Sequence, residues 1–234
     1  MKIVICLVWI VGVLGLMFNQ RPVTVNGKNN EAETDTTKPD LNKIEEFNSL
    51  IQKRFLTEPG FGMVRIQPTP PYSNHLSSFY PKDSSEKKAV EGFERDGWKV
   101  GLYLFGKRTE RRIKNGVEQK GFLSDYKLKQ PVIITKNIRE REELSNSSRI
   151  LKKVKEAFLQ FQESVDSEEK PFEFDSGGWS YFAKPVRAVN ASCVQCHTDY
   201  VVIKKSEDGN YQLRRRKVGD VNGILVYAFK KIKK

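Results

Sequence analysis

The chain has 234 residues, of which 38% are hydrophobic and 30% charged, and its formal net charge is +12. This composition excludes a disordered chain, because the apolar fraction suffices for a core. Three cysteines are too few for a small disulfide-stapled protein. The length fits one sizeable domain with an appendage, and the charge favours acidic partners.

Residues 1–18 (MKIVICLVWIVGVLGLMF) form a positively charged start followed by an apolar run. This pattern predicts either a signal peptide or an N-terminal membrane anchor, and no clear small-residue cleavage site decides between them. As a helix, the apolar run would span only about 24 Å of a hydrocarbon core about 30 Å thick. In either case we expect an exported protein, periplasmic or tethered to the outer face of the inner membrane, with no nucleic-acid partner.

A single domain is predicted after this leader. Residues 19–40 lack periodicity and read as a flexible tether, so the domain spans residues 41–234. Its first helix is expected over residues 41–55, with Asp40 as the N-cap. A proline-rich stretch, residues 67–72, then leads into a loop that contains His75.

The rest of the domain predicts an α+β fold, an antiparallel sheet flanked by helices. Residues 98–105 alternate as a strand does, and Asn115-Gly116 is a hairpin signal. Pro185 marks its strand as an edge or terminal segment. The remaining expected elements are strands over residues 131–135, 179–187 and 223–230 and a helix over residues 148–165.

The most specific motif is CVQCH at residues 193–197, in a loop near the C-terminal end. Two cysteines three positions apart and followed at once by histidine are the pattern of c-type haem attachment. The two thiols bind the two vinyl groups of one porphyrin, and the imidazole becomes the proximal iron ligand. The motif therefore predicts one covalent haem c on Cys193 and Cys196, with His197 on the iron.

Three alternatives explain the motif less well. A thioredoxin-like redox pair would open a helix after a buried strand, and it would leave His197 unused. A structural zinc site needs four ligands, and only His75 and carboxylates are left to complete the set. A plain disulfide explains the histidine no better. We expect covalent haem.

The second axial ligand of the iron is open to three interpretations. His75 is one candidate, Met63 is a weaker one, and a vacant position is the third. A second histidine implies a low-potential electron carrier, a methionine raises the potential, and a vacant position permits small diatomic ligands.

Residues beside the motif suggest further roles. Trp179, Tyr181 and Phe182 could wall the haem or fill the sheet core, and Arg187 could pair with a haem propionate. The basic runs at residues 214–217 and 230–234 are expected at solvated strand ends and in a tail. They would offer a docking surface to an acidic redox partner or an anionic membrane.

The segments YFAKPVRAVNASCVQCH (residues 181–197) and GDVNGILVYAFKK (residues 219–231) resemble periplasmic PAS-like c-type haem domain proteins. The resemblance covers roughly the last 60 residues, and only Cys193, Cys196 and His197 carry over from it. It implies a PAS-like sheet and either electron transfer or haem-based redox or gas sensing through a partner. No kinase, cyclase or methyl-accepting module is present, which favours a monohaem electron-transfer cytochrome. We expect no enzymatic activity, because no distal acid–base pair for a peroxidase can be picked out.

Overall fold

A computed structural model of the protein describes residues 38–57, 77–107, 113–114, 117–118, 126–138, 144, 147–164, 170–196, 200–205 and 211–232. The helices are α1 (Leu41–Thr57), α2 (Ser84–Arg95), α3 (Ser147–Glu163) and α4 (Ala191–Cys196). The strands are β1 (Ser77–Ser78), β2 (Trp98–Lys107), β3 (Ile113–Lys114), β4 (Val117–Glu118), β5 (Tyr126–Leu128), β6 (Val132–Ile133), β7 (Phe172–Ser176), β8 (Trp179–Arg187), β9 (Tyr200–Lys205), β10 (Tyr211–Arg215) and β11 (Val221–Lys231).

The main sheet has seven strands in the order β1-β6-β2-β11-β8-β7, with β5 paired to β2. Its pairings are antiparallel except that of β1 with β6. The long strand β11 lies between β2 and β8, so that Ile224 is opposite both Phe105 and Pro185. The expected α+β class with a mostly antiparallel sheet is confirmed, and the arrangement is consistent with a PAS-like fold.

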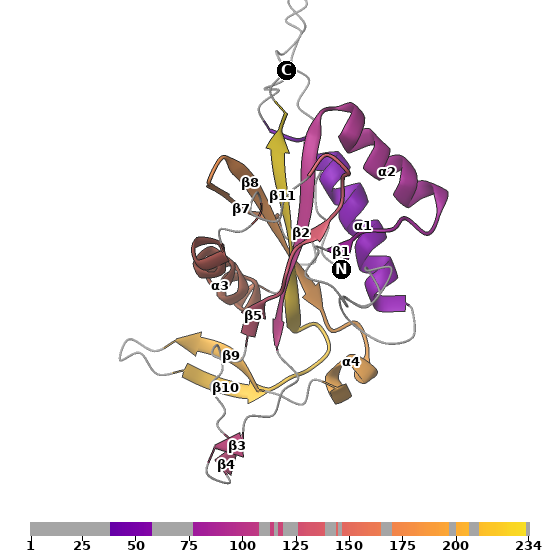
Figure 1. The fold of residues 1–234 in the computed structure, drawn as a ribbon. Helices are drawn as coiled ribbons and strands as arrows, with labels where there is room; N and C mark the ends of the chain where they lie inside the picture. Colours follow the sequence, from indigo (N-terminus) through magenta and orange to yellow (C-terminus); the bar gives the residue numbers. More distant parts are fainter. Residues whose placement is uncertain are drawn as a thin grey trace, which may run out of the picture. The chain divides into compact units, whose positions relative to one another are not determined.

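Helices cover both faces of this sheet, with α1 and α2 on one side and α3 on the other (Figure 1). The alternation in β2 serves both layers. Val100 and Leu102 join the cluster beneath α1 and α2, whereas Tyr103 and Phe105 join the cluster beneath α3. The predicted alternation of β2 is thus correct, and both faces of the strand are buried in its central part.

The first helix begins where the sequence predicts it. The side chain of Asp40 accepts a hydrogen bond from the Asn42 N–H at 2.9 Å, which satisfies one free donor of the first turn. Helix α1 also holds the end of β8, because Gln52 Nε2 donates to the Pro185 carbonyl at 2.8 Å. Strand β7 pairs with β8 only over Trp179–Ala183, where β8 is an inner strand. At Pro185, β8 pairs with β11 alone and is therefore an edge strand, as the sequence predicts.

Several elements were not predicted from the sequence. Helix α2 follows the segment read as a loop, and its N-cap Asp83 accepts the Glu86 N–H at 2.8 Å. Strands β9 and β10 form a two-stranded antiparallel sheet, and β9 contacts α3. The predicted hairpin is confirmed as β3 paired with β4.

The leader and nearly all of the tether lie outside the described residues. Within the described ranges, no helix is both long enough and apolar enough to cross a membrane.

Candidate functional site

The cysteine motif begins in a short helix at one end of β8. Strand β8 ends at Arg187, and α4 starts at Ala191 instead of the loop that was expected. Asn190 caps this helix, since its Oδ1 accepts the Cys193 N–H at 3.2 Å and the Ser192 hydroxyl at 2.6 Å. Because positions three apart share one side of a helix, α4 brings the positions of Cys193 and Cys196 to the same side.

Cys193 is the motif residue whose side chain the structure describes. It is 3% exposed, and its thiol is free rather than paired in a disulfide. His197, the side chain of Cys196, and both predicted sixth ligands, His75 and Met63, lie outside the described part of the chain. Their roles stay predictions.

A loop at residues 216–220 is fastened to the chain just before α4. The Ala188 N–H donates to the Asp220 carbonyl at 2.8 Å, and the Gly219 N–H donates to the Ala188 carbonyl at 2.8 Å. Gly219 has a φ of +93°, which a residue with a side chain rarely adopts. The structure therefore places this loop, which leads into β11, next to the segment that enters the cysteine motif.

Arg187, the predicted propionate partner, holds this corner together. Its Nη1 donates to the Gly219 carbonyl at 2.7 Å, and its Nη2 donates to the Phe161 and Ser164 carbonyls at 3.1 Å each. The last two acceptors lie at the C-terminal end of α3, where free carbonyls and the helix dipole favour a cation. Arg187 therefore ties the end of α3 to the loop beside the motif.

Asp220 is the centre of a second set of contacts in this loop. Its carboxylate, 5% exposed, accepts Arg214 Nη1 at 2.7 Å, Arg214 Nη2 at 2.5 Å and the Lys217 N–H at 2.6 Å. Burial alone would raise the pKa of Asp220. The hydrogen bonds from Arg214 and Lys217 and the charges of Arg214 and Arg216 nevertheless bring that pKa below its ordinary value.

The basic run at residues 214–217 is therefore not simply a solvated strand end, as was expected. Arg216 is 5% exposed. Its Nη1 donates to the Val221 carbonyl at 2.6 Å and to Asn222 Oδ1 at 2.7 Å, and its Nη2 donates to the Tyr126 hydroxyl at 2.9 Å. Sequence reasoning missed this residue, because burial of one arginine within a basic run has no signal in the sequence.

The predicted aromatic wall begins at the other end of β8. At about 3.3 Å per residue, Trp179 lies about 26 Å along the strand from Arg187. Trp179 is buried, with Lys230 Nζ 5.6 Å from its ring centroid, and Tyr181 stacks on Phe174 at 4.8 Å between centroids. Burial raises the pKa of Tyr181 to about 12, so this phenol stays neutral.

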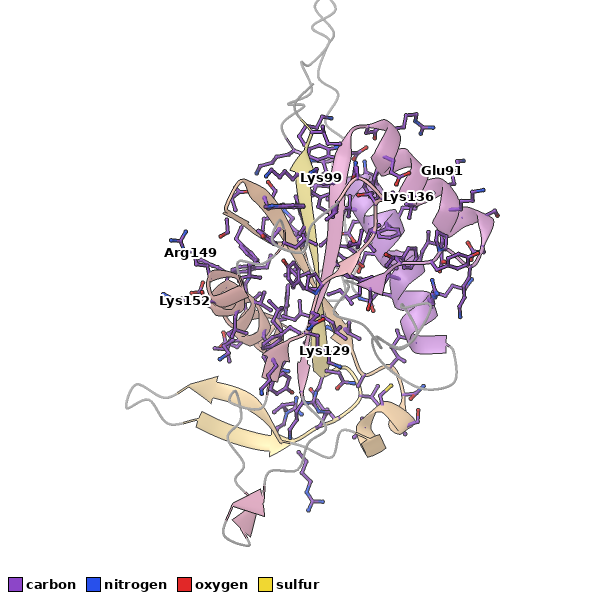
Figure 2. All side chains as sticks on the ribbon, viewed as in Figure 1. Glu91, Lys99, Lys129, Lys136, Arg149 and Lys152 are labelled. Carbon is purple, nitrogen blue, oxygen red and sulfur yellow. The ribbon has the colours of Figure 1, made fainter. Side chains whose placement is uncertain are left out.

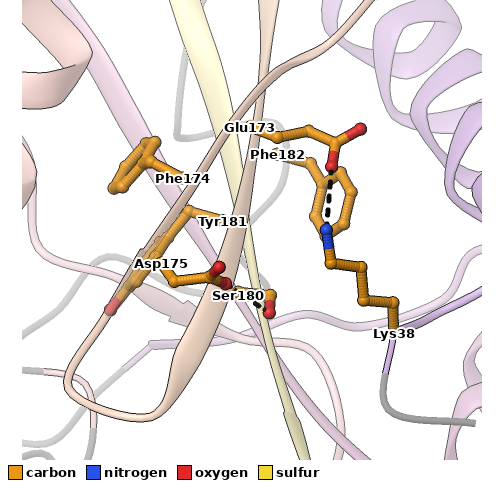
Figure 3. Close-up of a pocket in the computed structure, with 7 residues that line it drawn as sticks. All are labelled: Lys38, Glu173, Phe174, Asp175, Ser180, Tyr181 and Phe182. Carbon is orange, nitrogen blue, oxygen red and sulfur yellow. Dashed lines mark hydrogen bonds and ion pairs between the residues drawn. The ribbon is translucent and has the colours of Figure 1, made fainter.

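A shallow hollow lies beside β7 and this part of β8 (Figure 3). Its lining includes Lys38, which pairs with Glu173 at 3.7 Å, together with Tyr181 and Phe182. With a volume of about 120 Å³ it is well below the several hundred Å³ of ordinary ligand pockets, and a porphyrin does not fit into it. In the described ranges, no three histidine, cysteine, aspartate or glutamate side chains are grouped to hold a metal ion.

Comparison with known proteins identifies the family. The Tll0287-like family, named after a cyanobacterial cytochrome c-like protein, matches residues 32–229, most of the chain including the whole cysteine motif. Comparisons with curated proteins and with solved structures give no significant match. The match begins within the tether and ends in β11, and the chain belongs to the Tll0287-like family.

Proposed function

We propose that this protein is an exported monohaem c-type cytochrome that acts in electron transfer. Cys193 and Cys196 would hold the haem through two thioether bonds, and His197 would be the proximal iron ligand. The observation that carries the proposal is the CVQCH sequence in a chain whose family is named after a cytochrome c-like protein. The leader supports it, because covalent haem attachment takes place outside the cytoplasm.

Two structural observations fit a covalently bound haem. The Cys193 thiol is free, which a thioether bond requires. The loop bonded to the segment that enters the motif begins with Arg216, whose guanidinium is buried and whose Nε has no partner among the described residues. A haem carries two carboxylates, so a site with buried positive charge suits it electrostatically.

The haem would supply a one-electron couple, and the residues of this chain would hold and orient it. Cys193 is fixed in place, because its N–H is bound by the Asn190 cap and its side chain packs in the interior. The hydrogen bonds of the 216–220 loop keep the chain before α4 in one conformation. A preorganised surround limits the rearrangement that accompanies each electron transfer.

The partner would be a redox protein with an acidic docking face. The net charge of +12 favours such a partner over long range. Arg149 and Lys152 point away from the sheet on α3 (Figure 2), and both are exposed.

A second candidate function is haem-based sensing of redox state or of a small gas, relayed to a partner protein. The observation that favours it is the PAS-like sheet, since sheets of this kind also serve as sensory input domains. The sixth iron ligand separates the two functions. An iron with both axial positions filled, for example by His75, suits electron transfer, and an open position suits gas binding.

The test is expression with export and the cytochrome c maturation machinery, followed by denaturing electrophoresis with haem staining and intact mass. We expect one haem that survives denaturation. Cys193→Ser and Cys196→Ser together should abolish it. The matched control is Cys6→Ser, a change of the third cysteine, which lies in the apolar leader outside the motif, and it should leave the haem unchanged. A wild-type protein without covalent haem would contradict the proposal.

Absorption spectra with and without carbon monoxide then separate the two functions. Low-spin bands that do not shift when carbon monoxide is added, but that change in His75→Ala, would support electron transfer through a six-coordinate haem. High-spin bands that shift with carbon monoxide would favour the sensor instead.

A further inference from the structure

Arg216 is a buried cation that has only neutral hydrogen-bond partners in the described part of the chain. Its acceptors are the Val221 carbonyl, the Asn222 side-chain amide and the Tyr126 hydroxyl. Its Nε is fully buried and has no hydrogen-bond partner among the described residues. Asp220 is close enough to interact with this charge but is not hydrogen-bonded to it. A buried charge without a charged hydrogen-bond partner is costly, so a further anion is expected beside this side chain.

The carboxylate that the described residues place in this cluster is already hydrogen-bonded to other groups. Asp220 accepts both Nη atoms of Arg214 and the Lys217 N–H, so its three hydrogen bonds go to groups other than Arg216. Among the described residues, this carboxylate is therefore shared by the Arg214 and Arg216 guanidinium groups, which leaves one positive charge unmatched there. The nearby guanidinium of Arg187 is matched separately, by the carbonyls at the end of α3.

The loop that Arg216 opens lies at the entrance to the cysteine motif. Arg216 opens the loop whose Gly219 and Asp220 are hydrogen-bonded to Ala188, three residues before α4. Strand register agrees, because Val221 is opposite Arg187. In a chain that binds haem at residues 193–197, the haem would carry two carboxylates close to this loop.

We infer that Arg216 binds a carboxylate of the haem and raises its reduction potential, an inference that rests on the proposed function. Arg214 and Asp220 then act as positioning residues, since they fix the loop that carries Arg216. The guanidinium favours the reduced haem, because the ferrous centre has one positive charge fewer than the ferric one. The propionate role of Arg187 stays a prediction, and Arg216, which the sequence had placed in a solvated run, would be a further partner for a haem carboxylate.

The experiment compares Arg216→Met, Arg216→Lys and the control Lys153→Met in the exported full chain. Covalent haem is measured by staining and mass, the midpoint potential by redox titration, and the propionate bending band by resonance Raman spectroscopy. Arg216→Met should keep the haem and shift the reduced-to-oxidised ratio toward the oxidised form about tenfold, about 59 mV for a one-electron couple. Its propionate band should also move.

Arg216→Lys should retain most of the potential, because the charge remains, but should still shift the propionate band, because the two-pronged donor is lost. Lys153→Met should change neither, since an exposed charge is screened by water. If Arg216→Met does not accumulate, the propionate band of Arg216→Lys tests the inference: a shifted band supports it, and a band like that of the wild type contradicts it. Haem-loaded Arg216 variants with the potential and band of Lys153→Met would overturn the inference and leave the cytochrome proposal intact. A wild-type chain without covalent haem would overturn both.

Discussion

Replacing Asp220 with asparagine tests whether the 216–220 loop is held by charge. The carboxylate accepts three hydrogen bonds, two from Arg214 and one from the Lys217 N–H. Asparagine keeps one acceptor oxygen, which at the Oδ2 position still accepts two of these bonds. One charge-assisted bond is therefore lost and the other two lose their negative acceptor, which together costs about 3–4 kcal/mol. Because Arg214 is one third exposed, water recovers part of this loss, and we expect destabilisation of about 2–3 kcal/mol.

The assay is thermal unfolding followed by circular dichroism at pH 7. For a domain of this size the expected decrease in melting temperature is about 2–4 °C per kcal/mol, or roughly 5–10 °C. The matched control is Asp175→Asn, the same chemical change at an exposed aspartate whose partner is the Ser180 hydroxyl at 2.6 Å. We expect the control to stay within about 0.5 kcal/mol of the wild type.

The difference between the wild type and Asp220→Asn should depend on pH in a defined direction. The folded-state pKa of Asp220 is lowered, so its carboxylate stabilises the folded protein at pH values above the unfolded pKa of about 3.9. That contribution is lost as the pH falls through the folded pKa. A difference that stays constant from pH 7 to pH 3, or an Asp220→Asn melting curve like that of Asp175→Asn, would refute the reasoning.

Three further changes test the packing. Arg54→Met should lower the free energy of unfolding by about 3–5 kcal/mol, because the buried Glu86 carboxylate, 3.1 Å from Arg54 Nη1, would lose its charged partner. In a double-mutant cycle, the effects of Arg54→Met and Glu86→Gln should be strongly non-additive. Gly223→Ala should lower the melting temperature measurably by calorimetry, because its Cβ would lie 2.7 Å from the Phe105 carbonyl oxygen across the sheet. Phe47→Ala should cost about 3–5 kcal/mol in chemical denaturation, because this ring is fully buried.

The parts of the fold that sequence reasoning found have a strong local signal. Strand β8 was predicted with its correct bounds, and α1 was predicted from helical spacing and the Asp40 cap. Helix α2 was missed because its apolar stripe is short, with Val90 and Phe93 among lysines and glutamates. Its capping pattern, Asp83 followed by Glu86, is the signal that could have found it.

The candidate site shows the same division between local and long-range information. The CVQCH motif can be read directly, because covalent chemistry fixes its residue spacing. Burial of Arg216 cannot, because it depends on Tyr126, which lies ninety positions earlier in the chain. The loop bonds to Ala188 likewise become visible only when β11 is paired with β8.

The central place of β11 has a consequence for the timing of assembly. Strand β11 joins β2 to β8, and it follows the cysteine motif along the chain. A chain that emerges from a translocation channel N-terminus first would therefore present residues 193–197 while β2 and β8 still lack their common partner. Pairing over such a long sequence separation is also slow. If the chain is the exported cytochrome proposed above, its two thiols would thus be accessible to an attachment enzyme before the last strand completes the sheet.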